Sequence, residues 1–351
     1  MALDQQAAAE QAWQMLSGFI QAAQMIPQKQ RAADGSLPLT VIGGFLGAGK
    51  TTLVNKLLSG THGVRVAVLV NDFGRINIDS ALITSQTADT ISLANGCACC
   101  TIAGDLTKTL LELAGRTEPP EAIVLEASGL ADPLGIAQVA LANPALRLDG
   151  ILAVLDAEAA ARTAADPACA ATFSAQASAA DLVILNKVDL VDAATLAGAR
   201  ALAAELAPGK PVIETSQSEV PAEIVLGIRS ARVLAPGLAP DAGHAAAFGS
   251  WSGSTTALLD SVALRAMLDS LPASVLRAKG VLRLSDAPDR RTVYQRVGKR
   301  WSFVTDDRPE SSQQSSLVVI GPANAIDATE LSRRFDACHT SRGAPLMNRP
   351  G

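Results

Sequence analysis

The sequence predicts an α/β fold in which a mainly parallel sheet covered by helices is followed by a smaller α+β domain. Short apolar runs rich in Val, Ile and Leu recur between residues 39 and 228, and stretches with helical periodicity separate most of them. Beyond residue 250 the apolar runs follow one another directly, which suits antiparallel pairing. Strands that are apolar throughout and are joined by helices belong to parallel sheets with both faces covered.

Seven apolar runs are the expected strands of the first domain, over residues 39–44, 65–70, 90–93, 122–126, 150–156, 181–186 and 211–214. Helical periodicity is seen over Thr51–Leu58 and Asp105–Ala114. In the second domain we expect helices at about 258–271 and 327–337, and strands over 275–284, 291–297, 300–305 and 316–321.

Changes in composition divide the chain into five parts. Residues 1–37 are an N-terminal extension with one short amphipathic helix, which packs on its own protein, belongs to a partly disordered segment, or docks a partner. The linker between the domains is rich in Pro, Gly and Ala. The first domain is expected over 38–228, the linker over 229–249, the second domain over 250–340 and a tail over 341–351.

Composition excludes several classes of protein. The 351 residues are 48% hydrophobic and 18% charged, as in globular proteins with a large core. A net charge of −5 without blocks of like charge gives no basic field for a nucleic acid. The apolar runs are too short to span a membrane. The first basic residue is Lys29, so residues 1–28 lack the positively charged region of a signal peptide. The five cysteines are unevenly spaced and form no disulfide framework, which favours a reducing compartment. We therefore expect a soluble cytoplasmic protein with no nucleic acid and no membrane partner.

The segment GGFLGAGKTT has the pattern of a phosphate-binding loop between a strand and a helix, so the first domain is expected to be a P-loop NTPase. Its glycines let backbone N–H groups curl around a polyphosphate at the positive end of the helix dipole. The ammonium group of Lys50 can reach the β and γ phosphates, and the hydroxyl group of Thr51 can hold Mg²⁺. The nucleotide-binding candidates here are Gly44, Gly47, Ala48, Gly49, Lys50, Thr51 and Thr52.

A second motif follows the run 181–186, where Asn186, Lys187 and Asp189 have the spacing of a guanine-recognition motif. The carboxylate of Asp189 can accept hydrogen bonds from the ring N–H and from the exocyclic amine of guanine. Adenine offers neither group in that arrangement, and a buried carboxylate would be left unpaired. The four-residue pattern also occurs in ordinary loops, but its place after a phosphate loop and a strand predicts GTP.

Two further segments complete the predicted nucleotide site. In IVLEASGLADP a strand ends in Glu126, which can hold the magnesium shell or orient the attacking water, and Gly129 can offer its N–H group to the γ phosphate. The alternative is a strand-end acid followed by an ordinary turn. The segment VNDFGRINIDSALI stands where a switch region is expected, with Asp72 and Asp79 as its acids.

Three of the five cysteines, Cys97, Cys99 and Cys100, lie within four positions in LANGCACCTIAGDL. In an extended chain the thiols of Cys97 and Cys99 point the same way. Clustered sulfurs favour Zn²⁺, Cu(I) or Co²⁺ over Mg²⁺. The alternatives are inert buried thiols or a redox pair.

A closed zinc site usually takes four ligands, and no second pair of ligands stands beside this cluster. The site either holds metal transiently or takes a ligand from the switch, where Asp72 is the best candidate. The isolated cysteines, Cys169 and Cys338, are interpreted as structural, and the chain's histidines are His62, His244 and His339.

The ordered set GGFLGAGKTTL, NDFG…ID, NGCACCTIAGDL, EASGLADP and NKVDL closely resembles the CobW-like GTPases, the family of cobalamin synthesis and nitrile hydratase activator proteins. The match covers about residues 38–340, because VLRAKGVLRL, VYQRVG and LVVIGP resemble that family's C-terminal domain. The resemblance implies a GTP-dependent metallochaperone, mostly for zinc and in some branches for cobalt. It also implies that Cys97, Cys99 and Cys100 bind the metal.

This sequence departs from the family in three places. Asp72 stands where many members have Glu, and Arg75 occupies a switch position that is often acidic. The linker retains only His244 in place of the histidine-rich run that many members carry. A metal-storing linker is therefore not expected.

We expect a GTPase that delivers a transition metal, zinc first, to a client metalloprotein. Its catalytic candidates are Lys50, Glu126 and Asp72, and its cofactors are GTP, Mg²⁺ and Zn²⁺, with Co²⁺ as the alternative ion. Binding of GTP brings the Asp72 switch against the cysteine loop, and hydrolysis releases the ion. A cobalt-directed chaperone, a regulatory GTPase with structural cysteines and a scaffold with a vestigial nucleotide site remain alternatives. Assembly as a homodimer is left open.

Overall fold

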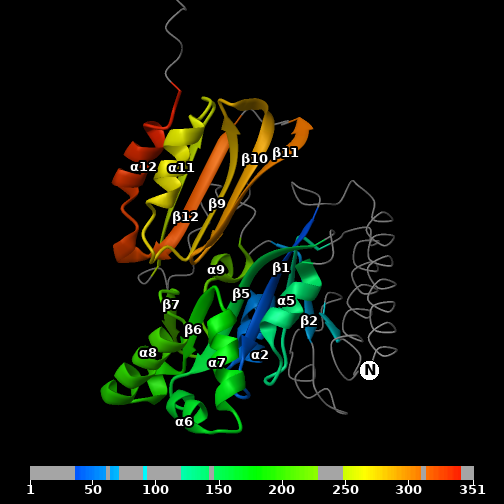
Figure 1. The fold of residues 1–351 in the computed structure, drawn as a ribbon, viewed down its shortest axis with the longest axis vertical. Helices are drawn as coiled ribbons and strands as arrows, with labels where there is room; N and C mark the ends of the chain where they lie inside the picture. Colours follow the sequence, from blue (N-terminus) through cyan, green and yellow to red (C-terminus); the bar gives the residue numbers. More distant parts are fainter. Residues whose placement is uncertain are drawn as a thin grey trace, which may run out of the picture. The chain divides into compact units, whose positions relative to one another are not determined.

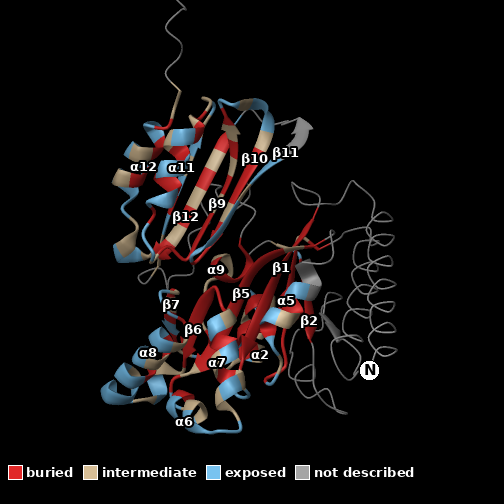
Figure 2. Cartoon of the chain, viewed as in Figure 1, coloured by how far each residue is buried: buried red, intermediate tan, exposed pale blue. Residues whose placement is uncertain are grey.

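The computed structural model describes residues 36–60, 64–70, 90–92, 120–141, 146–227, 248–309 and 314–340. The chain divides between Leu226 and Gly227 into two compact units, each built on its own sheet (Figure 1). In both units the strands carry most of the buried residues, and the exposed residues gather on helices and turns (Figure 2).

The first unit holds a seven-stranded sheet in the order β3-β2-β4-β1-β5-β6-β7, in which every neighbouring pair is parallel. The strands are β1 (Leu37–Gly44), β2 (Val66–Val70), β3 (Thr90–Ser92), β4 (Ala122–Glu126), β5 (Leu146–Asp156), β6 (Leu182–Asn186) and β7 (Val212–Thr215). The predicted parallel sheet is confirmed. β5 begins before the expected run, because Arg147 and Asp149 interrupt its apolar pattern.

Both faces of this sheet are buried, as the unbroken apolar runs predict. Alternate residues of β1, such as Leu39 and Val41, share a core with Ile136 and Ala137 of a helix. The residues between them are also buried, and there Thr40 donates a hydrogen bond to the carbonyl oxygen of Val225 at 3.0 Å. The helices in the described part of this unit are α2 (Lys50–Ser59), α5 (Pro133–Leu141), α6 (Ala160–Ala165), α7 (Ala170–Ala179), α8 (Ala193–Leu206) and α9 (Ala222–Leu226), and η2 (Val188–Leu190) is a short 3₁₀ turn.

The second unit is a five-stranded sheet in the order β11-β10-β9-β12-β8, with antiparallel neighbours throughout. Two helices pack on one face of it, each begun by an aspartate that accepts hydrogen bonds from the first turn, Asp260 and Asp327. The elements are β8 (Phe248–Thr255), α11 (Ser261–Asp269), β9 (Arg277–Leu284), β10 (Ala287–Val297), β11 (Arg300–Pro309), β12 (Ser315–Pro322), η3 (Ala323–Ala325) and α12 (Ala328–Asp336). The predicted α+β character is confirmed.

Strand β8 has no counterpart in the sequence prediction, which assigned Phe248 and Gly249 to the linker. Its sequence, FGSWSGST, has no apolar run, and Trp251 is its one buried residue. Backbone pairing with β12 holds it in place, in a register that sets Trp251 beside Val319. The strand is therefore specified by a long-range partner and not by its own composition.

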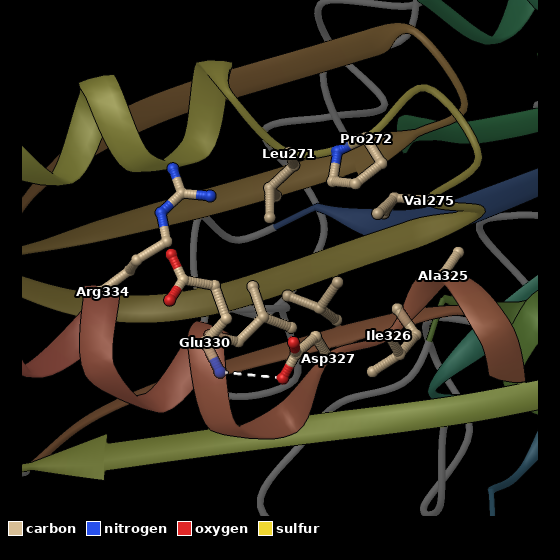
Figure 3. Close-up of a pocket in the computed structure, with 10 residues that line it drawn as sticks. Leu271, Pro272, Val275, Ala325, Ile326, Asp327, Glu330 and Arg334 are labelled. Carbon is tan, nitrogen blue, oxygen red and sulfur yellow. Dashed lines mark hydrogen bonds between the residues drawn. The ribbon is translucent and has the colours of Figure 1, made fainter.

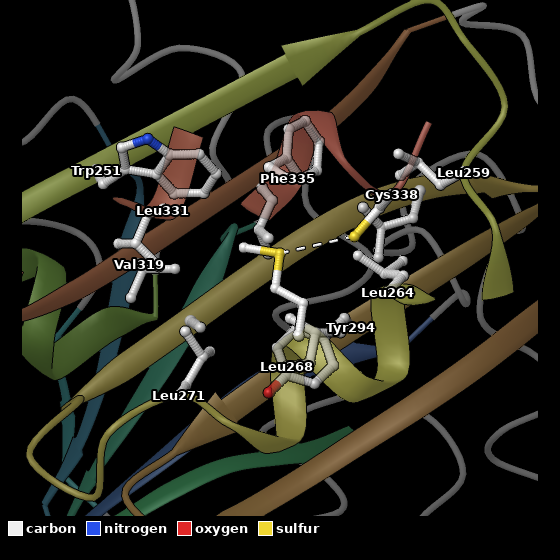
Figure 4. Close-up of a cluster of buried hydrophobic side chains, with 14 of the residues drawn as sticks. Trp251, Leu259, Leu264, Leu268, Leu271, Tyr294, Val319, Leu331, Phe335 and Cys338 are labelled. Atoms are coloured by element: carbon white, nitrogen blue, oxygen red, sulfur yellow. Dashed lines mark hydrogen bonds between the residues drawn. The ribbon is translucent and has the colours of Figure 1, made fainter. Parts of the chain in front are cut away.

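The core of the second unit is built around Trp251 and Phe335, whose rings meet edge to face with centroids 5.6 Å apart (Figure 4). The indole N–H of Trp251 donates to the hydroxyl group of Ser332 at 2.9 Å. Cys338 lies buried in this core with its sulfur 3.9 Å from that of Met267, and burial raises the pKa of its thiol. A buried, protonated thiol acts as a small apolar side chain.

A small cavity of about 80 Å³ lies beside this core (Figure 3). Leu271, Pro272, Val275, Ile326 and Leu331 give it an apolar lining. Asp327, Glu330 and Arg334 also line it. Ligand pockets usually measure about 300–1,000 Å³, so this cavity is too small to be a candidate nucleotide site.

Within the described residues, no helix combines the length and the hydropathy that a membrane crossing requires.

Tyr294 of β10 is the chain's only tyrosine and is 2% exposed. Burial raises its pKa to about 12, which the nearby Arg296 partly offsets. An unfolded tyrosine ionises near pH 10. The folded state thus binds the phenol proton more tightly than the unfolded state does. The resulting contribution of Tyr294 to stability is complete below about pH 10 and is lost as the pH rises towards 12.

We predict that phenolate absorbance of the folded chain titrates near pH 12 and that of the denatured chain near pH 10. The free energy of unfolding should fall by about 3 kcal/mol over that interval. Tyr294→Phe is the control, because it removes the absorbance change and this share of the pH dependence. A folded-state midpoint near pH 10 would contradict the prediction.

Candidate nucleotide-binding site

The phosphate-loop residues form one continuous turn between the end of β1 and the start of α2. Gly44 has a φ of 137° and Gly49 a φ of 108°, both in the left-handed region that favours glycine. A Cβ atom at Gly44 would lie 2.3 Å from the carbonyl oxygen of Val154, and one at Gly49 would lie 2.3 Å from the side-chain nitrogen of Asn186. Glycine is therefore required at both positions.

Lys50 is the first residue of α2 and is buried. Its ammonium group donates to the carbonyl oxygen of Phe45 at 3.2 Å, across the mouth of the loop. The backbone N–H of Ala48 donates to the same oxygen at 3.2 Å. The loop is thus closed on itself around the helix N-terminus, the place where backbone N–H groups and the helix dipole favour an anion.

Thr51 and Glu126 meet beside this loop. The hydroxyl group of Thr51 donates to Oε1 of Glu126 at 2.8 Å. Glu126 ends β4, which neighbours β1 with Glu126 opposite Ile42, and it is 1% exposed. A hydroxyl and a carboxylate oxygen side by side are the hard donors that Mg²⁺ prefers, so these two residues fit a magnesium ion.

The chain turns sharply after Glu126. The N–H of Ala131 donates to the carbonyl oxygen of Ser128 at 3.0 Å, and Gly129 sits in this turn against the phosphate loop. A Cβ atom on Gly129 would lie 2.6 Å from the side chain of Leu46 and 2.9 Å from its backbone nitrogen. The turn and the loop therefore approach each other as closely as glycine permits.

Asn186 ends β6 and ties three loops together. Its side-chain NH₂ group donates to the carbonyl oxygen of Ala48 at 2.8 Å and to the hydroxyl group of Ser218 at 2.9 Å. Its side-chain oxygen accepts from the N–H of Ser218 at 2.8 Å, and Ser218 donates to the carbonyl oxygen of Gly49 at 2.9 Å. Asn186 thus shapes the phosphate loop.

The residues after Asn186 adopt a strained turn. Lys187 has a φ of 64°, and its ammonium group pairs with Asp156 at 2.6 Å. Asp189 is exposed in the short turn η2. Left-handed backbone at a non-glycine residue costs about 1–3 kcal/mol and clusters at ligand sites, which supports a binding role for this loop.

Three residues of this site escape sequence reasoning. Ser218 and its neighbour Gln217 have φ angles of 56° and 51°, and Ser218 is fully buried. Gln176 of α7 donates to the carbonyl oxygens of Gly129 and Ala131. Neither TSQS nor the alanine-rich α7 has a recognisable local pattern, so the sequence holds no signal for them.

The proposed metal site and the switch lie outside the described residues. This applies to Asp72, Arg75, Asp79, Cys97, Cys99, Cys100, His62 and His244, and to the helix expected over Asp105–Ala114. Within the part of the chain that the structure describes, no three His, Cys, Asp or Glu side chains cluster as metal ligands. The metal assignments stay predictions, as do the roles given to the nucleotide-site residues.

Two family models match the chain. The CobW/HypB/UreG nucleotide-binding domain matches residues 38–214, and the cobalamin synthesis protein CobW C-terminal domain matches residues 248–339. The chain belongs to the CobW family. Both sheets of this CobW-family chain fall within the matched ranges, apart from the first residue of β1 and the last residue of β7.

Named relatives agree with this assignment. A zinc chaperone CobW of Pseudomonas aeruginosa is 33% identical over 344 residues, covering 86% of this chain and 90% of its own length. A zinc chaperone CobW of Sinorhizobium is 38% identical over 229 residues, which is 56% of this chain and 64% of that protein. The crystal structure of the Zn(II)-bound YjiA GTPase from E. coli covers 87% of this chain and 99% of its own at 22% identity, with a TM-score of 0.38. That TM-score is too low to carry an argument.

Replacing Gly49 tests the packing of the loop. We predict that Gly49→Ala weakens GDP binding by roughly tenfold or more and lowers the free energy of unfolding by about 1–3 kcal/mol, because its Cβ atom displaces Asn186 and because φ is positive. Calorimetric GDP titration and urea unfolding measure the two effects.

Gly198→Ala is the matched control. Gly198 lies in α8 with nothing within 4 Å of the added atom, so this change should stabilise the chain by about 0.5–1 kcal/mol and leave GDP affinity unaltered. Equal behaviour of the two variants would contradict the packing described for Gly49.

Proposed function

We propose that this chain is a GTP-hydrolysing metallochaperone that carries zinc and transfers it to a client metalloprotein. The observation that carries the proposal is the contact of Thr51 with Glu126 beside a closed phosphate loop, in a chain of the CobW family. The zinc chaperones named among its relatives support the choice of zinc.

The triphosphate is bound by the loop and by α2. The N–H groups of the phosphate loop and of the first turn of α2 donate to phosphate oxygens, and Lys50 leaves the carbonyl oxygen of Phe45 to reach the β and γ phosphates. Thr51 and Glu126 hold Mg²⁺, which neutralises charge on the phosphates when bound. Gly129 offers its N–H group to the γ phosphate, and orientation of the attacking water is the alternative role for Glu126.

Guanine is selected at the end of β6. Asp189 accepts hydrogen bonds from the ring N–H and the exocyclic amine of the base. The pairing of Lys187 with Asp156 holds this loop over the end of β5, and Asn186 fixes its distance from the phosphate loop.

Zinc is the cargo of this cycle. Cys97, Cys99 and Cys100 provide soft sulfur donors, and Asp72 of the switch completes the site when GTP is bound. Hydrolysis withdraws Asp72 and the ion passes to the client, a metalloprotein that docks partly on the C-terminal domain. Thiols bind as thiolates, so loading releases protons and strengthens as the pH rises. The cycle takes place in the cytoplasm and uses neither nucleic acid nor membrane.

Base specificity gives a sharp test of the nucleotide site. Asp189→Asn replaces one acceptor by a donor, so the side chain then matches xanthine, which has a carbonyl in place of the exocyclic amine. We predict that GTP affinity falls by roughly a hundredfold or more and that XTP binds in its place. Lys50→Ala is the control that loses both nucleotides. Unchanged GTP affinity in Asp189→Asn would place the base elsewhere.

The coupling of nucleotide and metal is tested by zinc competition against a chelator. We predict tighter Zn²⁺ binding with a non-hydrolysable GTP analogue than with GDP or no nucleotide, and analogue binding tightened by zinc by the same factor. Cys99→Ser should weaken Zn²⁺ binding at least tenfold and leave GTP affinity unaltered. Cys169→Ser, outside the motif, is the matched control. Equal Zn²⁺ affinity in all nucleotide states would favour a regulatory GTPase instead.

A further inference from the structure

Helix α7 touches both segments that the proposed triphosphate site needs. Phe173 packs edge to face on Phe45 of the phosphate loop, with ring centroids 6.4 Å apart. Three residues later Gln176 donates from Nε2 to the carbonyl oxygen of Gly129 at 3.1 Å and to that of Ala131 at 3.0 Å. Positions i and i+3 share one helix face. The same face of α7 therefore holds the loop and the turn.

Gln176 is a costly choice for packing alone. It is 1% exposed, and its neighbours on this helix face, Phe173 and Ala177, belong to an apolar core. Its Oε1 atom is buried without a hydrogen-bond partner among the described residues, which costs about 1–3 kcal/mol. An apolar side chain would fill the same space without that cost. What the amide adds is its pair of hydrogen bonds to the carbonyl oxygens of the turn.

The hydrogen bonds from Gln176 limit how the turn, and with it the N–H group of Gly129, can rotate. The carbonyl oxygen of Ser128 is held by the N–H of Ala131, and in a trans peptide the N–H of Gly129 points the opposite way. Gln176 holds the next carbonyl, that of Gly129, and also the carbonyl of Ala131. With these carbonyls held, the turn cannot rotate its peptides freely beside Leu46 of the phosphate loop.

We propose that Gln176 is a positioning residue for recognition of the γ phosphate. By holding the carbonyl oxygens of Gly129 and Ala131, it sets the Gly129 N–H group where the γ phosphate of GTP arrives and where GDP has no group to meet it. Gln176 touches no nucleotide itself. The inference rests on the proposed GTPase function, in which the N–H group of Gly129 distinguishes GTP from GDP and Gln176 positions it.

The test compares affinities for GDP and for a non-hydrolysable GTP analogue in two variants. Gln176→Met keeps the length of the side chain and removes both N–H donors. We expect GDP affinity within about twofold of wild type, analogue affinity about tenfold weaker, and a lower kcat, because the Gly129 N–H group that the turn positions meets the nucleotide only when the γ phosphate is present.

Gln176→Glu is the second variant and adds a readout that a structural role would not move. Its carboxylate cannot donate, but its protonated form can donate one hydrogen bond to the turn. A buried carboxyl group has a raised pKa, so analogue affinity should recover as the pH falls, while GDP affinity follows that of wild type. Ser178→Ala on the same helix is the matched control, because among the described residues that hydroxyl group donates to the carbonyl oxygen of Ala175 within α7.

The outcomes separate the two levels of the proposal. If Gln176→Met lowers Tm and changes the GDP and analogue affinities by one common factor, the proposed role of Gln176 is overturned. The same holds if it lowers Tm and leaves both affinities unchanged. A wild-type chain that binds neither GDP nor the analogue would overturn the proposed function, and this inference with it. Loss of analogue binding alone in Gln176→Met, with recovery at low pH in Gln176→Glu, supports it.

Discussion

Asn186 occupies the point where the loops after β1, β6 and β7 meet, and its amide uses both its donor and its acceptor side there. It is 2% exposed, so no water competes for these bonds. Its loss would leave the carbonyl oxygen of Ala48 and the N–H of Ser218 unsatisfied in the interior, at about 1–3 kcal/mol each. The curvature of the phosphate loop, the closeness of Gly49 and the strained conformation of Ser218 all depend on this one side chain.

Sheet order explains why so many functional groups converge on this point. β1 lies between β4 and β5, and the carboxyl ends of parallel strands lie at one edge of the sheet. The register sets Glu126 opposite Ile42 and Asp156 opposite Asn186. Residues from separate parts of the sequence therefore gather beside the phosphate loop, and Gln176 of α7 holds the neighbouring turn after β4.

Local patterns predicted much of this fold. The seven apolar runs correspond to seven strands, and GGFLGAGKTT forms a loop and the start of a helix. These elements could be predicted because strand burial and the glycine-dependent turn are determined by residues close together in the sequence. Strand β8 and the roles of Gln176 and Ser218 could not be predicted, since they depend on partners 32 to 169 residues away and leave no local signature. The cysteine motif rests on sequence alone, because it lies outside the described residues.

The long separations within the site also bear on how the protein is made. The bond from Asn186 to Ala48 spans 138 residues and that from Ser218 to Gly49 spans 169. During synthesis the phosphate loop leaves the ribosome long before the segments that give it its shape, and non-local pairings of this kind form slowly. A nascent chain therefore has a nucleotide motif but no nucleotide pocket. Once β6 and β7 are in place, a guanine nucleotide that binds only the finished domain draws the folding equilibrium towards completion.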